Sequence, residues 1–232
     1  AVVEYFRGLL LTLKGTSSEA MSVSVKWDGA PAVVCGTNPD NGKFFVGTKS
    51  VFSKTPKINY TKKDIANNHG TDELGQKLLK CLVHLKKLNI QGVVQGDLLY
   101  TDEGITRKNI DGKPHLTFTP NTITYAVPEG GELANQIDRA KLGIIFHTTY
   151  VGDSLATMNA QGGADVSSFT QSPDVFFDNA SYKDVSGSAK FTADESQQFY
   201  NSIDKLETLL NSVPRDLSSV LGQNTDFVPM FQ

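Results

Sequence analysis

The chain has 232 residues, of which 39% are hydrophobic and 20% charged, a composition typical of globular domains rather than disordered chains. No apolar run approaches the ~20 residues that a membrane-spanning helix needs, which argues against such a span. The formal net charge is −3. The two cysteines, Cys35 and Cys81, fit no metal-ligand spacing and predict a reducing compartment.

Apolar periodicity predicts helices and strands along the whole chain. In order, these are a helix over residues 2–14, strands over 22–27, 32–35 and 44–48, a helix over 72–88 capped by Thr71, strands in GVVQGDLLY, TITYAV and LGIIFHTTY, and a helix over 193–213 with a Thr192–Glu195 capping box. Residues 153–190 are rich in Gly, Ser, Asp and Asn, which indicates an irregular region.

This mixture of strands and flanking helices predicts an α+β fold. We expect a core over residues 1–152, an irregular insertion or loop region over 153–191, and a C-terminal helical segment over 192–232.

The charge of the chain is distributed unevenly. Between Lys43 and Lys63 there are six lysines and no acid, whereas the remaining 16 basic and 25 acidic residues sum to −9. One interpretation is a solvated loop, because SKTPKINYTKK is polar and contains a proline. The other is a surface for the phosphates of a nucleotide or nucleic acid, contacted by Lys54, Lys57, Lys62 and Lys63.

Lys26 lies in the alternating stretch SVSVKWDG and has two interpretations. It is an ordinary exposed strand lysine, since alternate strand residues point to opposite faces, or it is a nucleophile. A free lysine has a pKa near ~10.4, and a pocket with cationic neighbours lowers that value and releases the amine. Gly29 would let a ligand approach the backbone closely, and Asp28 would orient the lysine or cap its own turn.

The string Lys26-Trp27-Asp28-Gly29 resembles motif I of the covalent nucleotidyltransferases, which are ATP-dependent DNA ligases, RNA ligases and mRNA capping enzymes. The resemblance is nearest to phage RNA-ligase-like proteins. It implies a ligase-type (ATP-grasp-like) core of antiparallel sheets flanked by helices. It also implies that Lys26 attacks the α-phosphate of ATP, with GTP as the alternative, and that the nucleotide then passes to an RNA or DNA 5′ end.

Later segments resemble further motifs of this family in the same order. In VGTKS, Lys49 matches the residue that contacts phosphates, and in GVVQGDLLY, Asp97 stands where the family usually has Glu. The resemblance implies that Asp97 contacts the ribose or a Mg²⁺ or Mn²⁺ ion. TFTPNTITYAV and KLGIIFHTTY are similar to the strands that carry the base-stacking residue, for which Phe146 is the first choice and Tyr125 the second.

Each of these residues also has a structural interpretation. Asp97 would begin a turn, Phe146 would belong to the core, and His147 would be a hydrogen-bonded strand histidine.

The sequence departs from the family pattern after residue 150. Neither the fourth motif, a strand beginning Glu-Gly, nor the fifth, a Lys-x-Lys strand, is recognisable there. The chain is therefore expected to be an N-terminal part of a longer enzyme, or a ligase-like fold without activity that serves as a phage virion structural or accessory binding protein. KWDGAPA, FTPNT and HTTYVG resemble a ligase-like protein family of tailed bacteriophages. The expected location is the host cytoplasm or the virion, with no membrane partner.

Overall fold

The computed structural model describes residues 2–16, 24–181 and 190–212. The chain divides into two compact units. One combines residues 1–23 with 183–232, and the other spans residues 24–182. This differs from the division predicted from sequence, because the first helix belongs with the last one rather than with the core. We describe each unit by itself.

The smaller unit contains two helices from opposite ends of the chain, α1 (Val2–Leu13) and α5 (Ala193–Ser212). The rings of Phe6 and Phe199 meet edge to face at 6.3 Å, and Arg7 pairs with Glu207 at 2.7 Å. The predicted capping box at the start of α5 is confirmed. The Thr192 hydroxyl accepts from the Glu195 amide, and the Glu195 carboxylate accepts from the Thr192 amide.

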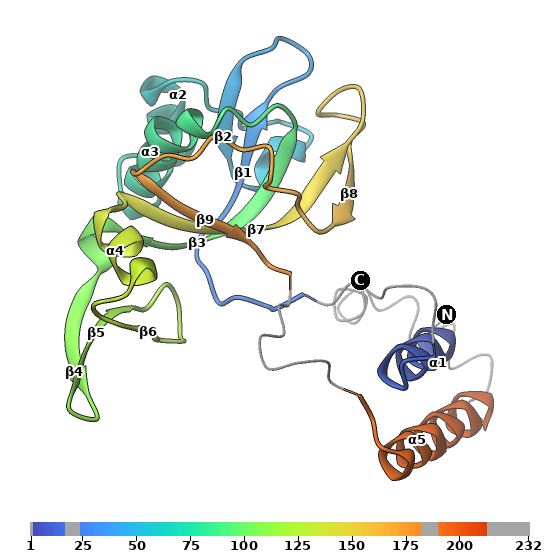
Figure 1. The fold of residues 1–232 in the computed structure, drawn as a ribbon. Coiled ribbons are helices and arrows are strands. Elements are labelled where there is room, and N and C mark those ends of the chain that lie inside the picture. Colours follow the sequence, from blue (N-terminus) through green and yellow to red (C-terminus); the bar gives the residue numbers. More distant parts are fainter. Residues whose placement is uncertain (1, 17–23, 182–189, 213–232) are drawn as a thin grey trace. The chain divides into compact units, whose positions relative to one another are not determined.

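The larger unit, which we call the core unit, is built on a six-stranded mixed sheet (Figure 1). Its strands are β1 (Ala32–Thr37), β2 (Phe44–Gly47), β3 (Val93–Thr101), β7 (Leu142–Val151), β8 (Asn159–Gly162) and β9 (Val175–Asn179). The order is β2-β1-β3-β7-β8, all antiparallel, and β9 pairs with β7 in parallel. With its flanking helices, the molecule is an α+β protein.

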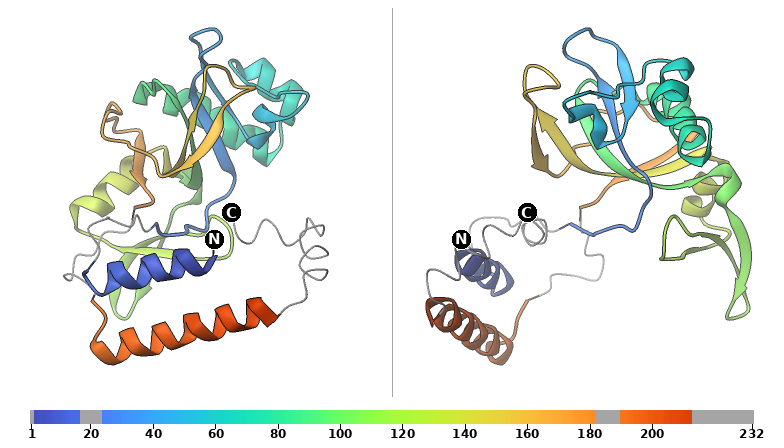
Figure 2. Two further views of the ribbon diagram at one scale, coloured as in Figure 1. Left: turned by 90° about the vertical axis from the view of Figure 1, so that its right-hand side faces the viewer. Right: turned by 180° about the vertical axis from the view of Figure 1, so that it is seen from behind.

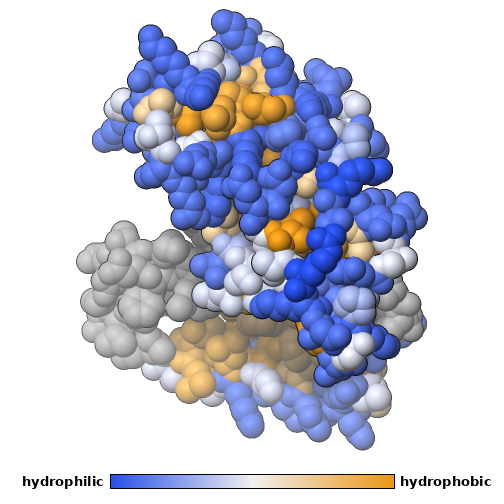
Figure 3. All heavy atoms as spheres, turned by 90° about the vertical axis from the view of Figure 1, so that its left-hand side faces the viewer, coloured by the Kyte–Doolittle hydropathy of each residue, from blue (hydrophilic) through white to orange (hydrophobic). Residues whose placement is uncertain are grey.

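Two helices, α2 (Lys62–His69) and α3 (Glu73–Leu85), cover one face of this sheet (Figures 1 and 2). Leu78, Cys81 and Leu85 of α3 pack there against completely buried side chains of β1, β3 and β7. An apolar pocket of ≈ 240 Å³ lies between the two helices, with Ile65 of α2 and Leu79 of α3 in its lining. Figure 3 shows hydrophobic atoms exposed near the top of that view. The predicted cap of α3 is corrected by one residue, because the Asp72 side chain accepts from the Gly75 amide.

Three short 3₁₀ turns complete the main chain around this sheet. They are η1 (Lys49–Phe52), η2 (Lys86–Leu88) and η3 (Asp102–Gly104).

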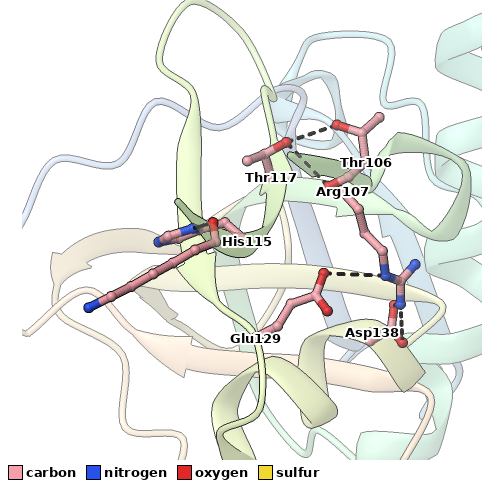
Figure 4. Close-up of polar contacts among 7 residues, drawn as sticks. Thr106, Arg107, His115, Thr117, Glu129 and Asp138 are labelled. Atoms are coloured by element: carbon pink, nitrogen blue, oxygen red, sulfur yellow. Dashed lines mark hydrogen bonds and ion pairs between the residues drawn. The ribbon is translucent and has the colours of Figure 1, made fainter. Parts of the chain in front are cut away.

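A smaller sheet follows β3 in the chain. It contains β4 (Thr106–Ile110), β5 (Lys113–Phe118) and β6 (Tyr125–Pro128), and α4 (Glu132–Arg139) comes after it. Figure 4 shows how Arg107 of β4 fixes this sheet to the helix. Its guanidinium pairs with Asp138 of α4 at 2.7 Å and with Glu129 at 3.4 Å.

Two predicted elements differ from the structure. The expected strand over 22–27 is limited, among the described residues, to an isolated bridge between Ser24 and Ser181, and residues 25–29 have no strand pairing. The expected irregular region is partly ordered, since β8 and β9 both pair with β7. Long β7 supplies the backbone partners for both strands, of which β8 is polar, whereas β9 contains the strand-like sequence VFF. Among the described residues, no helix is long and apolar enough to cross a membrane.

Candidate functional site

The segment Lys26–Gly29 lies against β3 at Asp97. A Cβ atom added to Gly29 would stand 2.4 Å from the Cβ atom of Asp97 and 3.0 Å from the Leu98 carbonyl oxygen. Just after this contact, the Ala30 amide donates to the Leu98 carbonyl at 3.0 Å, and the Leu98 amide donates to the Pro31 carbonyl at 3.1 Å. A glycine is therefore required at position 29, because only hydrogen fits between the two backbones.

This crossing creates a pocket of ≈ 310 Å³ on the face of the sheet opposite α2 and α3. It is lined by Ser24, Val25, Lys26, Trp27, Gln95, Asp97, His147 and Ala180. Lys26 is exposed, whereas Asp97 is half-buried. The pocket brings together two site residues, Lys26 and Asp97, that the sequence assigned to separate motifs.

Asp97 faces His147 across the pocket floor. Oδ1 of the carboxylate lies 3.4 Å from Nε2 of the imidazole, and their side chains are 20% and 28% exposed. Nδ1 of the same ring lies 2.8 Å from the Thr148 hydroxyl. Both ring nitrogens of His147 are thus in contact with polar groups, which fixes the imidazole beside Asp97.

Gln95 lies next to Asp97 on the same face of β3 and is 5% exposed. The Tyr150 hydroxyl donates to its Oε1 atom at 2.7 Å. Burial raises the pKa of this tyrosine, which keeps the hydroxyl protonated as a donor. The ring of Tyr150 in turn contacts that of Phe52, the last residue of η1, at 4.4 Å between centroids.

Asp28 points away from the pocket toward the loop before β6. Its carboxylate accepts hydrogen bonds from the Asn121 side chain, from the Ile123 amide, and from both the hydroxyl and the amide of Thr122, at 2.7–2.9 Å. These bonds, with that of Asn121 the largest contribution, hold the pKa of Asp28 far below its usual range. The carboxylate thus caps the loop at residues 121–123 rather than its own turn, and the other predicted role, orienting Lys26, stays a prediction.

Tyr125, the first residue of β6 in the smaller sheet, also holds the segment that contains Asp28. Its hydroxyl accepts from the Asp28 amide at 2.9 Å, and its ring lies 5.2 Å from that of Trp27. Trp27 and Asp28, the two residues after Lys26, are therefore both in contact with residues 121–125. Lys26 is exposed, and within the part of the chain that the structure describes its side chain forms no hydrogen bond or ion pair.

Comparison with known proteins gives one match. A family of unknown function, DUF6267, matches residues 1–228. The chain belongs to DUF6267. Neither a curated protein nor a solved structure matches it significantly.

Like Asp28, two further predicted site residues of this DUF6267 chain, Phe146 and Lys49, do not line the pocket. Phe146 is completely buried on the opposite face of the sheet, where its ring meets Phe169 edge to face at 5.4 Å. It therefore presents no ring surface to a ligand, and the residue next to it, His147, faces the pocket instead. Alternation along β7 accounts for this, because Leu142, Ile144 and Phe146 all pack in the cluster under α2 and α3, so the next residue points to the other face. A register shift follows at this point, since Gln95 pairs with Thr148 and Gly96 with Phe146, and His147 has no partner on β3.

Lys49 lies near the pocket without lining it. Gly47 pairs with Val34, and Val34 pairs with Gln95, so the end of β2 and Gln95 stand at the same level, two strands or about 10 Å apart. Lys49 follows Gly47 by two residues and is exposed. The turn η1, which carries Lys49, therefore begins just beyond the edge strand β2, two strands away from Gln95 and close to its level.

The four lysines of the predicted phosphate surface are exposed on η1's following loop and on α2. Lys54, Lys57, Lys62 and Lys63 form no ion pair among the described residues. Lys57 donates to the Asn68 carbonyl at 3.2 Å. The polar loop interpretation is incomplete, since Thr61 and Asp64 form a capping box that begins α2.

Among the described residues, no three side chains of the types His, Cys, Asp and Glu lie together in a group that could hold a metal ion. Asp97 is the acidic side chain that lines the pocket. Mg²⁺ is commonly held by one or two carboxylates together with substrate phosphates, and this donor set fits such an ion when a nucleotide supplies the remaining oxygens.

Proposed function

We propose that the core unit is a nucleotidyltransferase of the RNA or DNA ligase type that uses ATP, with GTP as the alternative. The observation that carries the proposal is the pocket that Lys26 and Asp97 both line, with Gly29 packed against Asp97. Two residues of the sequence resemblance, from distant segments, therefore line one cavity, and a third, Gly29, packs against one of them. Chance matches to a four-residue motif do not predict this convergence.

In the proposed reaction, the Lys26 amine loses a proton and attacks the α-phosphorus of the nucleotide. The new bond joins Nζ to phosphorus, the bond to the β-phosphate oxygen breaks, and pyrophosphate leaves with the electron pair. The lysyl-AMP then gives its nucleotide to the 5′ phosphate of an RNA or DNA strand. A Mg²⁺ or Mn²⁺ ion held by Asp97 and the phosphates would neutralise charge on the triphosphate.

Other residues have supporting roles in this proposal. Asp97 holds the ribose or the metal, and His147 keeps its carboxylate oriented. Lys49 contacts the outer phosphates from the edge of the sheet, and Trp27 with Tyr125 supports the lysine loop. The exposed Lys54, Lys57, Lys62 and Lys63 guide the nucleic-acid strand.

The experiment is intact-mass measurement of the full chain after incubation with Mg²⁺ and ATP, and separately with GTP. We expect a gain of one nucleoside monophosphate in the wild type and in Lys113→Ala, a control that removes another exposed lysine of the core unit. Lys26→Ala should show no gain. An adduct that persists in Lys26→Ala would refute the proposed nucleophile.

A second candidate is a ligase-like binding module without catalysis, which serves as a phage structural or accessory protein. It is favoured by the composition of the pocket, since Asp97 is the carboxylate that lines it and Phe146 is buried on the other face. This candidate predicts saturable nucleotide binding by titration calorimetry with no covalent adduct in the mass spectrum.

A further inference from the structure

Gln95 is a buried amide whose hydrogen bonding is incomplete. It is 5% exposed, and among the described residues its amide nitrogen has no hydrogen-bond partner. Asn59, which is also buried in the core unit, provides the contrast. Its nitrogen donates to the Val46 carbonyl at 2.8 Å, and its oxygen accepts from Asn68 at 3.0 Å. Unlike the ring nitrogens of His69 and His84, which are enclosed without a hydrogen-bond partner, Nε2 of Gln95 is not fully enclosed, so it opens to the pocket that Gln95 lines and is available to a ligand.

The orientation of this amide is fixed by Tyr150. The tyrosine hydroxyl donates to Oε1 of Gln95 at 2.7 Å, so the acceptor end of the amide is occupied and the NH₂ group is left for the pocket. Phe52 packs on the ring of Tyr150 and limits its movement. The pocket therefore contains a positioned neutral donor beside Lys26 and Asp97.

The position of Gln95 indicates what it would meet. Asp97 follows on the same face, about 7 Å along the strand, and the end of β2 that leads to Lys49 stands at the level of Gln95. Phe52 belongs to the same turn, η1, as Lys49. Gln95 thus stands about 7 Å along β3 from Asp97 and about 10 Å across the sheet from the end of β2 that leads to Lys49, within reach of a phosphate chain that extends from one to the other.

We propose that Gln95 binds the triphosphate of the nucleotide by donating from Nε2 to a phosphate oxygen, and that Tyr150 is the positioning residue that holds it there. This inference rests on the proposed function. A phosphate oxygen only accepts hydrogen bonds, which matches an amide whose own acceptor is engaged. A nucleobase edge that offers a donor beside its acceptor would need the Oε1 atom as well.

The test measures the dissociation constants of ATP and AMP by titration calorimetry on full-length variants. Gln95→Glu keeps the shape of the side chain but replaces the donor with a carboxylate that repels phosphate. We expect it to weaken ATP binding by about tenfold or more and AMP binding by less than about threefold. Tyr150→Phe frees the amide and should weaken ATP binding by about threefold, with AMP again less affected.

The matched control is Gln76→Glu, which adds the same charge on α3 at the opposite face of the sheet and should leave both constants unchanged. Equal weakening of ATP and AMP in Gln95→Glu, or no weakening of either, would overturn the inference while the proposed function stands. If the wild type binds neither nucleotide, the proposed function fails, and this inference fails with it. Thermal unfolding of each variant identifies a loss of folding, and in that case Tyr150→Phe decides.

Discussion

The two faces of the main sheet are made by the same strands and differ in what they contact. On the face under α2 and α3, the residues of β1, β3 and β7 form one apolar cluster without a polar interruption among its members. On the other face, two apolar clusters are separated by Gln95, Asp97 and His147. Since each cluster on the second face is smaller and polar side chains separate them, the comparison indicates that the first face is a continuous core and the second leaves room for binding.

The strongest test of this comparison is Phe146→Ala. The ring is completely buried in the apolar face, so its removal should destabilise the protein by about 3–5 kcal/mol in urea unfolding. Ile110→Ala, at an exposed strand position, should change stability by less than about 0.5 kcal/mol. A stable Phe146→Ala variant that had lost nucleotide binding would instead support the base-stacking role predicted from the sequence.

Gly29→Ala addresses the contact between the lysine loop and β3. The added methyl group would stand 2.4 Å from the Cβ atom of Asp97, so one backbone must move, at a cost of about 1–3 kcal/mol. Adduct formation at Lys26 should fall as well. Gly162→Ala, where a Cβ atom meets open space, is the control for both measurements. Unchanged stability and reactivity in Gly29→Ala would show that the loop lies elsewhere.

Asp28→Asn should have a smaller effect, and one that depends on pH. Because the folded state lowers the pKa of Asp28, its contribution to stability is present above the unfolded value of about 3.9 and is lost as the pH falls further. The variant should be less stable than the wild type at pH 7, and the difference should narrow below about pH 4. Urea midpoints measured from pH 7 to pH 3 check this. A difference that stayed constant over that range would contradict the assignment.

Asp97→Asn should have the smallest effect on stability. Its contact with His147 is partly exposed, and pairs of this kind contribute about 1 kcal/mol or less. Under the proposed function, adduct formation should nevertheless fall by about tenfold or more, since a charged group then no longer holds the ribose or the metal. A loss of several kcal/mol without a change in reactivity would assign Asp97 to the structure rather than to binding.

The sequence predicts the main sheet well and the smaller one poorly. β3 and β7 are long apolar stretches, so their periodicity is clear, whereas every residue of β4 is exposed and shows no alternation. Helix α2 was not predicted, because the lysines and Pro56 before it indicate a polar loop, although Thr61 and Asp64 match a capping box. The last helix is predicted to end at residue 213, and residues 213–232 lie outside the described residues.

The candidate site was predicted in part. Motif order identified Lys26 and Asp97, which line one pocket. It did not identify Gln95 or assign His147 to the pocket, because strand alternation places both on the face of Asp97 but does not show that residues 24–27 close a pocket over that face. The hydrogen bonds of Asp28 to residues 121–123 likewise depend on a tertiary contact far along the chain.

The bridge between Ser24 and Ser181 has a consequence for circular permutation of the core unit. The Val25 amide also donates to the Ala180 carbonyl at 2.7 Å, so the chain enters and leaves the core unit at adjacent points. Neighbouring ends of this kind suit circular permutation, in which a short linker joins residues 24 and 181 and new termini open in the turn between β1 and β2. Lys26 lies two residues from this junction, so a linker attached at residue 24 would lie next to the pocket that Ser24 and Lys26 line.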